Sequence, residues 1–175
     1  MKVAIFSESP ADEAAVRRLV DGVLGAPTSV QDLPRLRARG WGGLAGSLVM
    51  VVKDLHYQTD ADALAVVADA NHKPLHKDSH EPHENSDCRL CKLRALIERA
   101  QSELSPVPGR VPLRTAVGIA APALEAWYLC GKKSVSEALW ASGLESSREP
   151  YTKKQLKLWA YETERPSLER ERERA

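Results

Sequence analysis

Two polar residues, Asp69 and Asn71, stand just beyond a short apolar run, at a spacing that could serve metal or phosphate chemistry. The run at residues 63–67 (ALAVV) shows no alternation, which predicts a strand buried on both faces of a parallel sheet. Open α/β sheets usually bind ligands beyond the carboxyl ends of their strands, so this D-x-N pair is a candidate metal or phosphate position. The alternative interpretation is a plain turn, which both residue types favour.

Glu8 is a second acid expected at a strand end. It comes shortly after the β-branched and aromatic run at residues 2–6, which predicts the first strand. Ser9, Pro10 and Asp12 then have the types and spacing of a helix N-terminus, with Asp12 at the capping-box position. The positive end of that helix favours an ionised Glu8, and it could also hold an anion.

Glu125 is the third acid, and it lies in an apolar setting. The sequence around it, PALEAWYL, follows a predicted strand at residues 114–120 and begins a predicted helix at Pro122. A buried carboxylate that lacks a cation or hydrogen-bond donors takes up a proton rather than staying charged. Glu125 therefore needs a partner, either a metal ion shared with Glu8 and Asp69 or an arginine. A purely structural role is the alternative.

The segment at residues 72–91 is rich in metal-ligating side chains, because HKPLHKDSHEPHENSDCRLC carries four of the five histidines and two of the three cysteines. This polar composition cannot form a core by itself. Its H-x2-H-x4-C-x2-C pattern contains two pairs with two-residue gaps, and each pair can bind one side of a tetrahedral zinc ion. Four ligands would close the site and make it structural, whereas three would leave an open position; a flexible polar insertion is the alternative. The predicted ligands are His80, His83, Cys88 and Cys91, with His76 as an alternate.

Two groups of basic residues are candidates for contact with a nucleic-acid backbone. One lies in a glycine-rich connection beside Trp41, which offers a stacking face, and the other lies on the last packed helix. The net charge of +1 argues against a strongly basic nucleic-acid binder, although a balanced total can contain a local patch. A solvated face is the alternative for each group. The candidate residues are Arg35, Arg37, Arg39, Lys153, Lys154 and Lys157.

The elements that position these residues alternate between strands and helices, which predicts an α/β domain. A weak further strand is predicted at residues 30–33, and an irregular connection at residues 34–46. Helical spacing of apolar residues, together with capping residues, predicts the helices. They are expected at residues 10–24, 44–55, 93–104, 134–143 and 152–161, with a further one that begins at 121–122.

The length of 175 residues suits one domain rather than two. We expect a single domain over residues 1–165, with residues 72–92 as an insertion and residues 166–175 as a charged tail. No apolar run is long enough to span a membrane and no signal-peptide pattern is present, which predicts a cytoplasmic protein without a membrane partner. The three cysteines are an odd number, which argues against a disulfide framework.

Three motifs taken together resemble a toprim-like family of small bacterial proteins. They are FSESPADEAAVRRL around Glu8, VVADAN at residues 66–71 and IAAPALEAWYL at residues 119–129, within a resemblance that runs from residue 1 to about residue 157. The resemblance implies an α/β fold with a mostly parallel central sheet and helices on both faces, to which the His/Cys segment adds a zinc-binding insertion. Toprim domains occur in topoisomerases, primases and overcoming-lysogenisation-defect nucleases. Small members of this kind look like companions of ABC-type ATPases in bacterial defence.

The resemblance also implies a role for each acid. Glu8 would be the acid/base or metal-bridging carboxylate, Asp69 a ligand of Mg²⁺ or Mn²⁺, and Glu125 the counterpart of a downstream Glu in the nuclease-like members. Asn71 departs from the pattern, since it stands where the family has a second Asp. It keeps an oxygen ligand but removes a negative charge, which lowers the expected affinity for Mg²⁺. Ser9 stands where a Gly often follows the first acid.

Two functional hypotheses follow. The first is a Mg²⁺-dependent hydrolase of DNA or RNA phosphodiesters that uses Glu8, Asp69 and Glu125, with an ABC- or AAA-type ATPase subunit as its partner in bacterial anti-phage defence. The second is a catalytically inactive, zinc-stabilised binding or regulatory subunit on a toprim scaffold; a homo-oligomer is compatible with either. An enzyme of small phosphorylated molecules ranks last, because the chain lacks a glycine-rich phosphate loop of the usual spacing.

Overall fold

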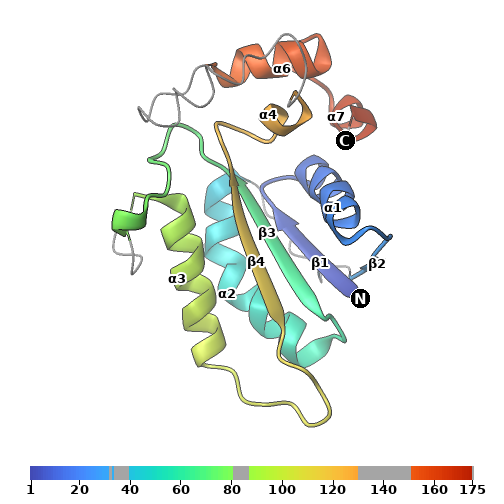
Figure 1. Cartoon of the computed structure of the whole chain (residues 1–175), viewed down its shortest axis with the longest axis vertical. Helices are drawn as coiled ribbons and strands as arrows, with labels where there is room; N and C mark the ends of the chain where they lie inside the picture. The colour runs from blue at the N-terminus through green and yellow to red at the C-terminus, as the bar shows by residue number, and fades with distance from the viewer. Residues whose placement is uncertain (32, 34–39, 81–86, 130–150, 175) are drawn as a thin grey trace.

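A four-stranded, all-parallel sheet forms the centre of the protein (Figure 1). The computed structural model describes residues 1–31, 33, 40–80, 87–129 and 151–174. The strand order is β2-β1-β3-β4, and the predicted parallel α/β fold is confirmed. The strands are β1 (Lys2–Ser7), β2 (Ser29–Val30), β3 (Ala63–Asp69) and β4 (Arg114–Ala120).

Within the described ranges, three helices connect the strands and cover the two faces of the sheet. Helix α1 (Pro10–Leu24) joins β1 to β2, α2 (Gly40–Gln58) precedes β3, and α3 (Arg89–Ser102) precedes β4. The connection after β1 leads to β2 at one edge of the sheet, and the connection after β3 leads to β4 at the other edge. The two connections therefore diverge between the adjacent strands β1 and β3. No helix in the described ranges is long and apolar enough to cross a membrane.

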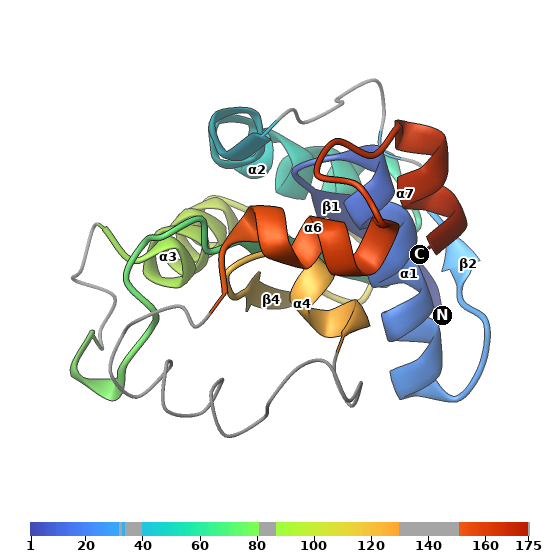
Figure 2. The same ribbon diagram turned by 90° about the horizontal axis from the view of Figure 1, so that it is seen from above.

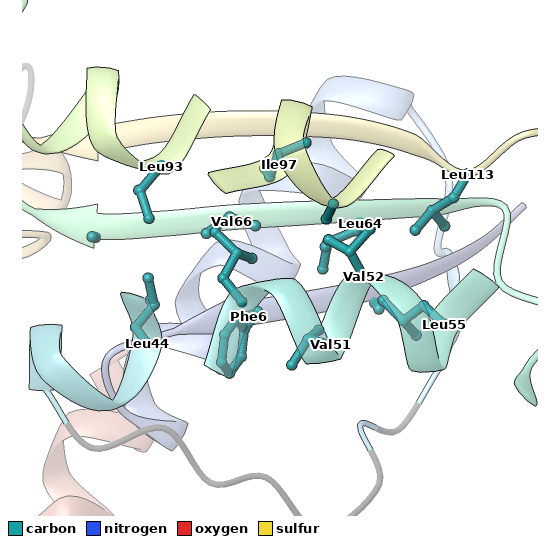
Figure 3. Close-up of a cluster of buried hydrophobic side chains, with 14 residues drawn as sticks. Phe6, Leu44, Val51, Val52, Leu55, Leu64, Val66, Leu93, Ile97 and Leu113 are labelled. Carbon is teal, nitrogen blue, oxygen red and sulfur yellow. The ribbon is translucent and has the colours of Figure 1, made fainter. Parts of the chain in front are cut away.

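The larger hydrophobic core lies between the sheet and the pair α2 and α3 (Figure 3). Successive residues of a strand point to opposite faces, so Phe6 of β1 and Leu64 and Val66 of β3 face these helices together. They meet Leu48 of α2 and Leu93 of α3, which are fully buried. This packing fixes α3, and with it the residues at the helix N-terminus.

The opposite face carries a smaller core, formed by Val3 and Ile5 of β1 with Ala15 and Val16 of α1. The prediction of helices on both faces is thus confirmed. An apolar groove of about 420 Å³ runs along this face, between α1 and strands β3 and β4. Val23 of α1 is among the groove residues and is exposed.

In the described part of the chain, three short helices form a layer above the carboxyl ends of the strands. Helix α4 (Glu125–Tyr128) follows β4, and α6 (Lys153–Tyr161) lies above it (Figure 2). Helix α7 (Leu168–Arg174) packs beside α1 and α6, so part of the predicted charged tail is helical. Thr152 and Gln155 form the predicted capping box of α6.

Two predicted boundaries are wrong in the same direction. Helix α2 begins at Gly40 rather than after an irregular stretch that ends at residue 46, and α3 begins at Arg89 rather than at Leu93. In both cases polar or glycine-rich sequence is helical because the apolar residues behind it pack on the sheet. The helix predicted at residues 134–143 lies outside the described residues.

Candidate functional site

Four acids gather at the carboxyl edge of the sheet, and we call them the acidic cluster: Glu8, Asp12, Asp69 and Glu125. Glu8 follows β1, Asp69 ends β3, and Glu125 opens α4 after β4. Because all strands are parallel, their carboxyl ends meet at one edge. Glu8, Asp69 and Glu125 therefore lie at the edge where the connections of β1 and β3 diverge, the usual ligand position of such sheets, and the charge of Asp69 acts on both Glu8 and Glu125.

Both carboxylate oxygens of Asp69 accept hydrogen bonds. Its Oδ1 accepts a hydrogen bond from the backbone N–H of Leu124 at 2.9 Å, and its Oδ2 accepts one from Lys153 Nζ at 2.5 Å. The first contact ties β3 to the segment before α4, and the second ties it to α6. Asp69 is buried, so these contacts replace the water that the carboxylate has lost.

Asn71 adopts the predicted turn conformation, and its side chain contacts a lysine. Its backbone has a φ of 47°, a left-handed conformation that asparagine tolerates in turns. Its Oδ1 lies 3.3 Å from the same Lys153 Nζ that contacts Asp69. Both oxygens of the D-x-N pair therefore face one cation, which here is an ammonium group.

Glu8 is held from two sides. Its Oε1 accepts hydrogen bonds from the backbone N–H of Asp69 at 3.1 Å and from Arg89 Nη1 at 3.0 Å. The same Nη1 donates to the carbonyl oxygen of Asp69 at 2.5 Å, and the Arg89 guanidinium lies 4.5 Å from the centre of the Trp41 ring. The Glu8 and Arg89 side chains are 12% and 11% exposed, so this is a largely desolvated ion pair.

In the described part of the chain Glu125 pairs with a lysine, where the sequence suggested an arginine or a shared metal ion. Lys157 Nζ lies 3.6 Å from Glu125 Oε1 and 3.2 Å from Glu171 Oε1 of α7. Glu125 is buried, and its lysine partner comes from the helix that also supplies Lys153. Helix α6 thus delivers two ammonium groups to the acidic cluster.

The environment of the cluster raises the pKa of Glu8, Asp12 and Glu125. Burial, and next the charge of Asp69, raise the pKa of Glu8, which Arg89 partly opposes. The same two causes raise the pKa of Asp12 to about 7. Burial also raises the pKa of Glu125, although a backbone hydrogen bond lowers it. Perturbed acids at a ligand-binding edge are a common feature of functional sites.

Four other side chains form a group that could hold a metal ion, and we call them the His/Cys cluster: His76, His80, Cys88 and Cys91. Their ligand atoms all lie within 4.8 Å of one another, and this is the only such group in the described ranges. No three members of the acidic cluster come within that reach of one another. His76 Nδ1 is 3.3 Å from Cys91 Sγ and 3.8 Å from Cys88 Sγ.

The predicted zinc ligands are thus brought together in part. His80, Cys88 and Cys91 belong to the His/Cys cluster, together with His76, which the sequence offered as an alternate. His83 lies outside the described residues. Two thiol and two imidazole groups are a common donor set of structural zinc sites, so the chemistry of this cluster suits a closed zinc site.

The predicted nucleic-acid contacts have separate outcomes. Lys153 points inward and pairs with Asp69, so it is engaged in the acidic cluster rather than on a surface patch. Lys154 is exposed and lies 3.6 Å from Glu164. The three arginines of this prediction, Arg35, Arg37 and Arg39, lie outside the described residues.

Three residues of the site were missed in the sequence. The sequence indicates only a helix-capping role for Asp12, which lies in the first turn of α1, four residues after Glu8. Arg89 stands between two predicted metal ligands, and Lys157 was placed on a surface patch. Each becomes visible only when elements distant in sequence meet, because its partners belong to other parts of the chain.

The fold and its two clusters define a class: a parallel α/β protein with buried acids at the carboxyl edge of its sheet and a His/Cys cluster that could hold zinc. No protein-family model matches the chain, and neither a curated protein nor a solved structure does so. The function must therefore be inferred from the site itself.

Proposed function

We propose that this chain hydrolyses phosphodiester bonds of DNA or RNA with the help of Mg²⁺ or Mn²⁺, as a toprim-type nuclease. The observation that carries the proposal is the gathering of Glu8, Asp69 and Glu125 at the divergence point of the sheet, with Asp69 and Asn71 directed at one cation. Carboxylate and amide oxygens are the donors that Mg²⁺ prefers. The Lys153 ammonium marks a position that suits a cation.

Each residue has a role that its surroundings support. Asp69, Asn71 and Glu125 would hold the divalent ion, which would stabilise the attacking and leaving oxygens of the phosphodiester. Glu8 would move a proton, because its raised pKa brings it closer to neutral pH than an ordinary carboxylate. Lys153 would leave Asp69 for a phosphate oxygen when the ion binds. The resemblance adds an ABC- or AAA-type ATPase partner and a role in bacterial anti-phage defence to the proposal.

A second candidate function rests on the Lys153 contact. An ammonium group already faces both oxygens of the D-x-N pair, and Asn71 supplies no negative charge. A zinc-stabilised binding or regulatory subunit without catalysis would have no need to release this lysine. In that case the protein binds nucleic acid or a partner but leaves phosphodiester bonds intact.

Incubation of the purified protein with plasmid, single-stranded DNA and RNA in Mg²⁺ or Mn²⁺ separates the two functions. We expect metal-dependent cleavage that Glu8→Gln reduces by about 100-fold or more, the range in which a general acid or base contributes. Glu103→Gln serves as the matched control and should cleave normally. Glu103 is the C-cap residue of α3 and forms surface ion pairs with Lys53 and Arg99.

Cleavage that survives Glu8→Gln unchanged would falsify the nuclease proposal. Binding of the same substrates without cleavage in either metal would favour the regulatory subunit instead. Lys153→Met adds a direct comparison, since removal of the competing ammonium should raise the apparent affinity for Mg²⁺ if the two cations share Asp69.

A further inference from the structure

Arg89 connects the His/Cys cluster to the acidic cluster through a single residue. Cys88 is the N-cap of α3, Arg89 is the first residue of the helix, and Cys91 follows two residues later. The two thiols belong to the His/Cys cluster, whereas the guanidinium between them in sequence reaches Glu8 and the carbonyl of Asp69. The backbone of one helical turn therefore carries contacts to both clusters.

The His/Cys cluster is built as a closed site. Cys88 and Cys91 are each only 1% exposed, and two imidazoles complete the set at distances that one tetrahedral ion can bridge. His76 and His80 come from the segment before α3, with His80 at the end of the 3-10 turn Asp78–His80. An ion bound there would link that segment to the first turn of α3.

The position of Arg89 depends on the backbone that carries it. Its Nη1 makes two hydrogen bonds, but its Nε is buried and has no hydrogen-bond partner within the described part of the chain. A buried donor without a partner costs free energy, so the side chain needs an external constraint to keep this place. The Trp41 ring restricts the guanidinium at one end of the Arg89 side chain, and the first turn of α3 fixes the backbone at the other end.

We infer that a zinc ion bound by His76, His80, Cys88 and Cys91 fixes the first turn of α3 and thereby holds Arg89 against Glu8 and Trp41. Zinc then acts on the acidic cluster without touching it, and Arg89 is a positioning residue. The inference goes beyond the proposed hydrolysis and is independent of it, because the same linkage would operate in a protein that only binds its partner.

The metal content of the purified protein tests the ligand set. Elemental analysis should find about one zinc per chain in the wild type. His76→Ala and Cys91→Ser should reduce this at least about fivefold, whereas His72→Ala and His83→Ala, which change neighbouring histidines of the same segment, should retain it. Zinc that is lost on His83→Ala and kept on His76→Ala would overturn this ligand set.

The fluorescence of Trp41 tests the linkage to Arg89, and it needs no activity. Removal of zinc from the wild-type protein with a chelator should change the emission of Trp41, and added Zn²⁺ should restore it. The change should disappear in Trp41→Phe and in Arg89→Ala, and persist in part in Arg89→Lys. Arg99→Ala, an exposed arginine of the same helix, should behave as the wild type.

Two results would overturn the linkage. One is an emission change of equal size in Trp41→Phe, which would show that zinc loss acts on other tryptophans or unfolds the chain. The other is an unchanged emission of the wild type after chelator treatment, when elemental analysis shows that the zinc has been removed. Because both measurements use the wild-type protein and variants outside the ligand set, they remain informative if Cys91→Ser fails to fold.

Discussion

Replacing Asp69 with alanine is expected to lower the free energy of unfolding by about 3 kcal/mol, the scale of a lost buried hydrogen bond and ion pair. The change leaves the backbone N–H of Leu124 without its acceptor and Lys153 without its carboxylate. Lys153 is 35% exposed and can turn to water, so most of the cost should come from the buried Leu124 N–H. Urea denaturation of the two proteins measures the difference.

Asp69→Asn separates the hydrogen bond from the charge. Its amide oxygen can still accept from Leu124, while the pairing with Lys153 is lost and the repulsion toward Glu8 is relieved. These two electrostatic changes oppose each other, so the variant should lose no more than about 1 kcal/mol. If Asn costs as much as Ala, the charge of Asp69 and not its hydrogen bond holds the segment before α4. Asp60→Ala, at an exposed ion pair with Lys2, should leave stability unchanged.

The strands and most helices could be predicted because their signals are local. The apolar runs that became β3 and β4 lack alternation, and Gly25 ends α1 in the left-handed conformation that glycine favours. Parallel pairing then follows from the intervening helices, since parallel neighbours need long crossovers. This local information already places Glu8 and Asp69 at one edge of the sheet.

The partners of the acids could not be predicted in the same way. Arg89 meets Glu8 across 81 residues of sequence, and Lys153 meets Asp69 across 84. Such pairs depend on how α3 and α6 pack, and nothing in the spacing of charges encodes that packing. His76, which the sequence offered only as an alternate zinc ligand, belongs to the His/Cys cluster for a similar reason, because the path of residues 72–80 brings its ring to the two cysteines.

Raising the pH from about 4 to about 8 in metal-free buffer is expected to destabilise the protein, and Asp12→Asn should remove a large part of this loss. The folded pKa of Asp12, about 7, lies above its unfolded value of 3.8. Its stabilising contribution is therefore present below the unfolded value and is lost as the pH rises through the folded value. A shift of about three units corresponds to at most about 4 kcal/mol.

The comparison with the variant isolates this effect from other titrations, including proton competition at a zinc site. The unfolding free energy of Asp12→Asn, relative to wild type, should increase between pH 4 and pH 7 and stay constant above. Asp21, near the other end of α1, gives a control of opposite sign: two hydrogen bonds from Thr28 lower its pKa, so Asp21→Asn should be less stable than wild type at neutral pH and approach it in acid. A wild-type minus Asp12→Asn difference that does not vary with pH would remove the case for a strained acidic cluster.

A divalent ion should reverse the loss, which links the pH dependence to the proposed chemistry. An ion bound among the acids would offset their mutual repulsion, so about 10 mM Mg²⁺ acting at a dissociation constant of about 1 mM should stabilise the wild type at pH 8 by about 1.4 kcal/mol. Asp12→Asn should respond less, because it presents one fewer charge. NaCl of equal ionic strength provides the control, since screening alone acts on exposed charges. Equal stabilisation by NaCl and Mg²⁺ would mean that the acids hold no divalent ion and that Lys153 is their lasting counter-ion.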